Sequence, residues 1–257
     1  MNVEEVSYLS IASLLILIIP VLVINRKLRI GLNKEIFYAL ARMVIQLSLV
    51  GLFLQSIFRL NNPFLNLAYL LFMIMVASFS AARSCSFQLF KLFIPLFLAF
   101  ILPNVIVLLF FNAFVISLDH LFNARYMITI GGMLLGNCLN GNIISVNRFY
   151  QAIKQNKNEY YYSLSLSTNK TEALRPYFKD AVLASINPTI ASIETIGLVA
   201  LPGMMTGQIL GGVLPLTAIK YQIAIMIAIL IARYFSAILA IIFTSFQAFD
   251  ENDVLIF

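Results

Sequence analysis

Residues 194–212 read Glu-Thr-Ile-Gly-Leu-Val-Ala-Leu-Pro-Gly-Met-Met-Thr-Gly-Gln-Ile-Leu-Gly-Gly, an apolar segment with a proline and a glycine at its centre. A helix within lipid has no backbone hydrogen-bonding group to spare, so a break at Pro202-Gly203 needs help from neighbouring helices, side chains or water. Gly203, Gly207 and Gly211 lie four residues apart on one helix face, where a second helix can approach closely. A membrane segment that is both broken and closely packed is more typical of a transport protein than of an anchor.

The composition indicates an integral membrane protein. Hydrophobic residues make up 61% of the 257 residues and charged residues only 11%, whereas soluble domains average about 25% charged residues. The net charge of +6 does not predict nucleic-acid binding, because the basic residues lie between apolar stretches and are better explained by orientation in a bilayer. Cys85 and Cys138 match no metal-binding spacing and predict no disulfide.

Apolar runs of membrane-spanning length predict an all-α, polytopic membrane protein with about seven transmembrane helices. We expect them to form a single transmembrane domain over residues 1–257. The runs are Val6–Ile24, Ile36–Phe58, Phe64–Ala82, Leu92–Ser117, Tyr126–Asn147, Pro188–Leu210 and Leu216–Phe246.

Basic residues alternate between the two ends of these helices. Twelve of the 17 Lys and Arg residues fall in the first, third and fifth connections, three lie at the opposite ends, and Arg42 and Arg233 lie within helices. Connections rich in Lys and Arg stay in the cytosol. The amino terminus is therefore expected outside, and the carboxyl terminus with Asp250, Glu251 and Asp253 in the cytosol.

One connection is long, a cytosolic loop over residues 148–187 that offers the main surface for a soluble partner. Within it, Asn169 and Glu172 have the spacing of a helix N-cap and its reciprocal acid. This spacing predicts a helix from Lys170 to Ile186, which the following Asn-Pro pair is expected to end. The segment Glu159–Ser167 predicts either a short helix along the membrane surface or an ordinary solvated loop.

Three ionisable residues lie within the expected helices, and such residues are functional candidates because charge is costly to bury in lipid. Arg42 lies near a helix end, where its side chain can extend to the headgroups. Glu194 lies about 9 Å into the bilayer after Pro188, and Arg233 lies about 24 Å along the next helix, at 1.5 Å per residue. We therefore expect an intramembrane Glu194–Arg233 pair that is either structural or part of a gate.

Small residues recur every four positions on two further helices. Ala228 and Ala232 belong to such a stripe in the last helix, and Gly132 and Gly136 to another in the fifth. Like the glycines of residues 203–211, they allow helices to pack closely, within one chain or across a dimer.

Polar and sulfur-containing side chains surround the expected break. Asn137 in the fifth helix needs a partner within lipid and would line a water-filled path. Met204 and Met205 offer thioether sulfurs, which suit some transition metals but are also ordinary apolar filler. The expected substrate path comprises Asn137, Glu194, Met204, Met205, Thr206 and Gln208.

The chain contains no G-x-x-x-x-G-K-[ST] sequence, no H-E-x-x-H sequence and no histidine cluster. No catalytic residue is therefore predicted, no cofactor is expected on this chain, and no metal ligands can be assigned. The energy for any uphill transport must come from another chain or from an ion gradient.

Residues 197–211 resemble the FetB-like permeases of bacterial iron-export ABC transporters, which are related to the plant aluminium-sensitivity permeases. The likeness runs along nearly the whole chain. Supporting pieces are Pro215, Ala218, Tyr221-Gln222, Arg42 with Gln46 and Gly51, Gly132-Met-Leu-Leu-Gly-Asn137, Glu172-Ala-Leu-Arg-Pro176 and Asn187-Pro188-Thr189. The family's coupling loop begins with an acid, which Glu159 supplies, and turns at a Gly-Ala pair, which Ser167-Thr168 replace.

The resemblance implies the permease subunit of an ABC transporter, in a bacterial plasma membrane and surrounded by lipid. A homodimer would work with two copies of an ABC-type ATPase, which would bind ATP and Mg²⁺. The cargo implied is iron or another metal, exported across the membrane. The residues expected to contact the ATPase are Glu159, Ser163, Leu164, Leu166, Ser167, Thr168 and Glu172.

Other functions fit the same spans. A gradient-driven secondary transporter or channel would explain the missing nucleotide site, with Glu194 as an ion site, although no inverted repeat is evident. An ABC permease for a non-metal cargo, such as a nucleotide sugar, fits as well. A membrane scaffold would make no use of the broken sixth helix.

Overall fold

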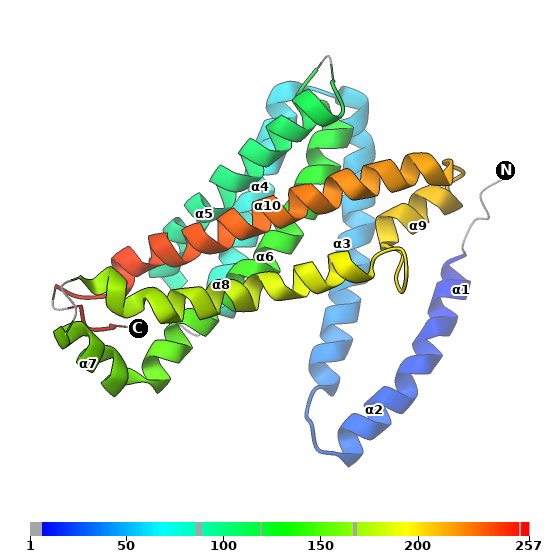
Figure 1. Cartoon of the computed structure of the whole chain (residues 1–257). Coiled ribbons are helices and arrows are strands. Elements are labelled where there is room, and N and C mark those ends of the chain that lie inside the picture. Colours follow the sequence, from blue (N-terminus) through cyan, green and yellow to red (C-terminus); the bar gives the residue numbers. More distant parts are fainter. Residues whose placement is uncertain (1–6, 86–88, 119, 167–168, 252, 257) are drawn as a thin grey trace. The chain divides into compact units, whose positions relative to one another are not determined.

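A computed structural model describes residues 7–85, 89–118, 120–166, 169–251 and 253–256 (Figure 1). Within these ranges the chain is helical and has no strand, apart from two isolated bridges at Ile196–Ala200 and Phe249–Leu255. The prediction of an all-α, polytopic membrane protein is confirmed.

Six helical segments of the described chain are long and apolar enough to cross a membrane, one fewer than expected. They are Ser10–Lys27, Asn33–Leu60, Pro63–Ser84, Lys91–Val115, Ala124–Gln155 and Pro215–Ala248. The expected sixth span, Pro188–Leu210, is wrong as a single helix. Its first part belongs to α8 (Lys170–Thr195) and its last to α9 (Gly203–Leu210), because Ile196–Pro202 is not helical.

Contacts divide the chain into two compact units. The single transmembrane domain over residues 1–257 stays a prediction. The smaller unit comprises residues 1–60 and 210–213 and contains α1 (Tyr8–Ser13), η1 (Leu14–Leu17), α2 (Ile18–Lys27) and α3 (Asn33–Leu60). The Asn33 amide donates to the Leu22 carbonyl at 3.2 Å, which ties the start of α3 to α2. A pair of helices buries few side chains, so most of the apolar residues of this unit are exposed in the isolated chain.

The larger unit comprises residues 61–209 and 214–257. Besides α8 and α9, it contains α4 (Pro63–Ser84), α5 (Leu89–Phe110), η2 (Phe111–Val115), α6 (Ala124–Gln155), α7 (Lys157–Leu166) and α10 (Pro215–Ala248). Helix α10 packs against α5, α6 and α8, and α4 packs against α5 and α6 (Figure 1).

Side-chain caps and amides fix the helix starts of the larger unit. The Asn62 side chain accepts from the Phe64 N–H at 2.9 Å, which caps α4. The Asn61 side chain accepts from the Ala124 N–H at 2.9 Å, and the Asn66 amide donates to the Phe122 carbonyl at 2.8 Å. These bonds hold the first turns of α4 and α6 together.

Small residues allow α10 to cross its neighbours closely. Ala228, Ala232, Ser236 and Ala240 are buried along one face of α10. The Ser236 hydroxyl accepts from the Asn142 amide and donates to the Ala99 carbonyl, each at 2.9 Å, and so joins α6, α10 and α5. Such interhelical hydrogen bonds stabilise helix association within a membrane.

The glycine stripes make fewer close contacts within the chain than expected. A Cβ atom on Gly132 would lie 3.1 Å from Met73, but Gly136, Gly203 and Gly207 have nothing within 4 Å, and Gly211 is exposed. The closest approaches are at Gly131 and Gly141, where a Cβ atom would lie 2.9 Å from the neighbouring helix. A four-residue spacing identifies a helix face but not what covers it.

Helix α8 continues through Pro188, so the expected helix end at Asn187-Pro188 is wrong. A proline removes one hydrogen bond and kinks a helix, but packing against α6 and α10 holds both sides of Pro188 in the same element. At the other end, α8 begins after Asn169 as predicted. The reciprocal cap with Glu172 is absent, because the Asn169 side chain makes no capping bond.

The predicted break is longer than a proline kink. Between Thr195 and Gly203 the chain turns at Gly197, whose φ of +84° favours glycine. The Gly197 N–H donates to the Ala200 carbonyl at 3.0 Å, and α9 begins at Gly203. The sequence therefore places the break correctly and underestimates its length.

A carboxyl-terminal turn fastens the end of the chain to α7 and α8. The Tyr160 hydroxyl donates to the Asp253 carbonyl oxygen at 2.9 Å, and the Asp253 carboxylate pairs with Lys170 at 2.6 Å. The Lys170 ammonium also lies 4.0 Å from the centre of the Phe249 ring. These contacts place α7 and the carboxyl terminus at the same end of the larger unit (Figure 1).

Replacing Tyr160 by Phe is expected to release this turn. The variant loses one hydrogen bond, which contributes about 1 kcal/mol. The fraction of molecules whose carboxyl-terminal turn is detached should therefore rise about five-fold. Limited proteolysis of the carboxyl-terminal residues measures that population. Tyr162→Phe is the matched control, because the Tyr162 ring is exposed on the same helix; equal cleavage of both variants would contradict the prediction.

The same contact predicts a pH dependence. Burial, and next the Asp253 carboxylate, raise the pKa of Tyr160 to about 12. Because this value lies above the unfolded value of about 10, the contribution of the neutral phenol to stability is complete below about pH 10 and is lost as the pH rises through about 12. The difference in ultraviolet titration between wild type and Tyr160→Phe should show one tyrosine ionising late.

Candidate functional site

A cavity of about 440 Å³ opens on the surface of the larger unit, beside the break that follows α8. It is lined by α6, α8, the segment between α8 and α9, the start of α9, and α10. Its polar lining residues are Asn137, Thr189, Ser192, Thr195, Gln222 and Arg233. The cavity thus adjoins the one long interruption between helices α8 and α9.

Arg233 is the only ionisable residue among those that line this cavity. Its side chain is 6% exposed and lies across α6 at Gly141, where an added Cβ atom would come within 2.9 Å of the Arg233 Cγ and Nε atoms. Ser185 of α8 lies at the same level and donates to the Gly141 carbonyl at 3.0 Å. The glycine therefore makes room for the arginine between α6 and α8.

The expected Glu194–Arg233 ion pair is not formed. The ion pairs among the described residues are Arg148–Asp180 and Lys170–Asp253. Glu194 is exposed on α8, nine residues beyond Ser185, or about 13 Å along the helix at 1.5 Å per residue. The sequence-based estimate counted the depth of Glu194 from Pro188, taken as the first residue of a membrane helix. In the structure α8 begins much earlier, so Glu194 and Arg233 lie at different levels along the bundle.

The structure brings together part of the expected substrate path. Asn137 and Met204 line the cavity, whereas Glu194, Met205, Thr206 and Gln208 do not. Met205 is buried. Sequence reasoning missed Thr189 and Gln222, whose Oγ1 and Oε1 atoms are buried without a hydrogen-bond partner. The signal available for Gln222 was a polar residue near the start of an otherwise apolar helix.

The donor set of the cavity does not resemble a resident metal site. Among the described residues, no group of three or more His, Cys, Asp or Glu side chains lies close enough to hold a metal ion. The polar lining consists of amide, hydroxyl and guanidinium groups, with thioethers at Met133, Met204 and Met226. A guanidinium donates hydrogen bonds and cannot ligate a cation.

The end of the unit that carries α7 presents the residues expected to contact an ATPase. Glu159 and Glu172 are exposed, and Ser163 is half-buried. Leu166 is 70% exposed, whereas Leu164 is half-buried against the core. Ser167 and Thr168 lie outside the described residues. Of the two alternatives for residues 159–167, a short helix or a loop, the structure has the helix, as α7, which begins at Lys157.

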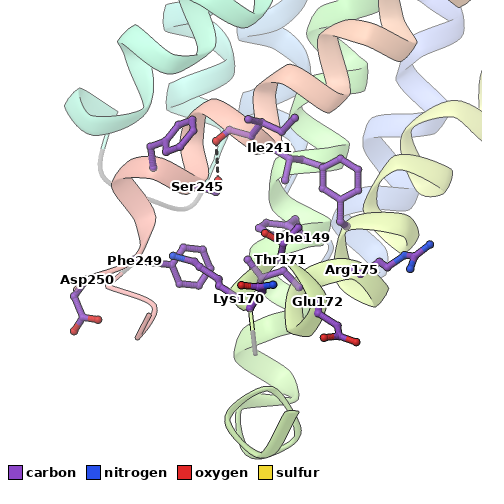
Figure 2. A pocket seen from close by; sticks show the side chains of 14 residues that line it. Phe149, Lys170, Thr171, Glu172, Arg175, Ile241, Ser245, Phe249 and Asp250 are labelled. Atoms are coloured by element: carbon purple, nitrogen blue, oxygen red, sulfur yellow. Dashed lines mark hydrogen bonds between the residues drawn. The ribbon is translucent and has the colours of Figure 1, made fainter. Parts of the chain in front are cut away.

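A groove of about 950 Å³ lies between the start of α8 and the end of α10 (Figure 2). Phe149 and Ile241 contribute to its apolar lining, and Lys170, Glu172 and Arg175 come from the first turns of α8. This groove, the carboxyl-terminal turn and α7 form one end of the larger unit. No local pattern predicts this turn, because it depends on contacts between residues about 90 positions apart.

Comparison with known proteins identifies relatives along nearly the whole chain. The profile of the family described as "Uncharacterised protein family (UPF0014)" matches residues 8–249. The chain is 30% identical to the "Probable iron export permease protein FetB" of Escherichia coli over 256 residues, covering 100% of this chain and 97% of the relative. No solved structure was found to match the chain.

Two further relatives come from a cyanobacterium and a plant. A UPF0014 membrane protein of Synechocystis is 33% identical, covering 88% of each chain. The "Protein ALUMINUM SENSITIVE 3" of Arabidopsis thaliana is 32% identical, covering 84% of this chain and 77% of the relative. The protein therefore belongs to the UPF0014 family and is a multi-pass membrane protein.

Proposed function

We propose that this protein is the permease subunit of an ABC transporter, that two copies of it span the plasma membrane, and that a separate ATPase supplies the energy. The observation that carries the proposal is the path from α7 to the cavity. Helix α8 starts beside α7 and runs without interruption for 26 residues, about 39 Å at 1.5 Å per residue. It ends at the break beside the cavity.

A continuous helix transmits a push along its length better than a loop does. An ATPase that closes on ATP and Mg²⁺ would move α7, and α8 would carry that movement to residues 196–202. The non-helical segment there lets α9 move separately from α8. The cavity lined by α6, α8, α9 and α10 would then change its shape and its access to either side of the membrane.

The cargo proposed is iron or another metal, since the E. coli relative is named a probable iron export permease. The direction proposed, export, comes from the same name. The orientation predicted from the basic residues places α7 in the cytosol, where ATP is available to the ATPase. The cavity would hold the cargo through its amide, hydroxyl and thioether groups. A nucleotide sugar or another organic cargo is the alternative within the same mechanism.

The test uses inside-out vesicles that contain this protein together with a candidate ATPase. Accumulation of ferrous iron that requires ATP, and that is lost when the P-loop lysine of the ATPase is replaced, would support the proposal. ATP hydrolysis that depends on the permease, without iron uptake, would refute the cargo alone. Uptake that needs no ATPase and is abolished by an ionophore would refute the ABC mechanism in favour of a gradient-driven transporter.

A further inference from the structure

Arg233 is a buried charge without a partner. It lies near the middle of α10 (Pro215–Ala248), and its Nε atom is buried with no hydrogen-bond acceptor. An arginine stays ionised in proteins, and a charge at membrane depth is costly unless it is paired. A residue of this kind within a membrane is a functional candidate, and its missing partner is an anion.

The described part of the chain supplies no anion to Arg233. Neither ion pair among the described residues includes Arg233. The groups known to lie around it, Gly141, Ser185 and Cys138, are neutral. The two acids of α8 on either side of Ser185 do not serve: Asp180 pairs with Arg148, and Glu194 is exposed and does not line the cavity.

The cavity offers further hydrogen-bond donors beside the arginine. Thr189 and Gln222 are each only 4% exposed and line the cavity together with Arg233 and Asn137. The Thr189 hydroxyl has no partner, so it is free to donate to a ligand. The unpartnered atom of Gln222 is its Oε1 acceptor, so Gln222 donates to an anion when its amide turns over and presents the N–H groups. A volume of about 440 Å³ is within the usual range for a small-molecule site.

We infer that this cavity binds an oxyanion group of the cargo, a carboxylate or a phosphate, through Arg233, with Thr189 and Gln222 as additional donors. A planar guanidinium matches both groups, because its N–H donors form two parallel bonds to their oxygens. The inference rests on the proposed function, because it takes the cavity to be on the transport path. It implies that a metal cargo crosses as an anionic complex, since a bare cation would be repelled by Arg233.

The test measures anion binding to the purified full-length protein in lipid nanodiscs, by calorimetry, with inorganic phosphate and citrate as separate probes. Wild type should bind at least one of them, and Arg233→Gln should weaken that binding roughly ten-fold or more, as expected for hydrogen bonds to a charged group. Binding of phosphate alone indicates a phosphate-bearing cargo, and binding of citrate alone a carboxylate-bearing one. Lys220→Gln is the matched control, because it removes one positive charge from an exposed part of α10.

A second pair of variants moves Arg233 without removing its charge. Gly141→Ala places a Cβ atom 2.9 Å from the Arg233 Cγ and Nε atoms and should displace the guanidinium, which weakens binding. Gly136→Ala on the same helix meets nothing within 4 Å and should bind as wild type does. Arg233→Lys should bind less tightly than wild type, because an ammonium lacks the two-bond geometry.

Thermal stability separates a binding role from a structural one. Arg233→Gln removes an uncompensated buried charge, so it should unfold at the wild-type temperature or above. Binding of neither anion by wild type, or equally tight binding by Arg233→Gln, would overturn the inference. If the protein binds an anion but shows no ATP-driven transport, the anion site stands and the proposed function is refuted. If it transports iron with ATP but binds no anion, the proposed function stands and the anion site is refuted.

Discussion

Leu166→Asp is expected to abolish ATP-driven transport while the helical bundle stays folded. Leu166 is 70% exposed at the end of α7 and contributes little to the core. The few residues that anchor an interface contribute about 2 kcal/mol or more, so a charge at Leu166, which we propose as such an anchor, should weaken ATPase binding by roughly 30-fold or more. Copurification of the ATPase and ATP-dependent uptake into vesicles measure both effects.

The control for this variant adds the same charge elsewhere on α7. Asn158→Asp alters an exposed polar residue of the same helix and should leave ATPase binding and transport unchanged. Leu164→Asp is not equivalent, because Leu164 packs against the core and its replacement would also loosen α7. Wild-type transport by Leu166→Asp would refute the docking role of α7.

Ala240→Leu is expected to have the largest effect on stability. Ala240 is fully buried on the face of α10 that crosses its neighbours. A leucine there must push the helices apart, and overpacking of this kind costs about 1–3 kcal/mol. The melting temperature in detergent should fall by roughly 2–10 °C, from the usual relation between stability and melting temperature.

Ala191→Leu makes the same change at an exposed position of α8 and should leave the melting temperature within about 2 °C of wild type. Equal melting temperatures for Ala240→Leu and wild type would show that α10 is not closely packed at this position.

The sequence predicted those features of the fold that depend on local composition. Apolar runs identified all six of the spans found in the described chain, because length and hydropathy alone decide whether a helix can cross lipid. The break at Pro202-Gly203 was also predicted, and a helix was one of the two alternatives for the segment that forms α7. Both depend on short segments whose own residues favour a break or a helix.

The features that depend on tertiary contacts could not be predicted. Asn187-Pro188 is a strong local signal for a helix end, yet packing against α6 and α10 keeps α8 continuous. That error moved the expected depth of Glu194 and created the expected pair with Arg233. The true environment of Arg233 depends on Gly141, a residue 92 positions away whose importance comes from its missing side chain.

The contacts of the carboxyl-terminal turn have a practical consequence for handling the protein. Asp253 contacts Tyr160 and Lys170, and Phe249 contacts Lys170. Residues 249–253 therefore belong to the same folded end as α7. An affinity tag or fluorescent protein fused to the carboxyl end would strain these contacts and crowd the surface proposed for the ATPase. A fusion of this kind can therefore mimic an uncoupled mutant, and labels for transport assays belong elsewhere on the chain.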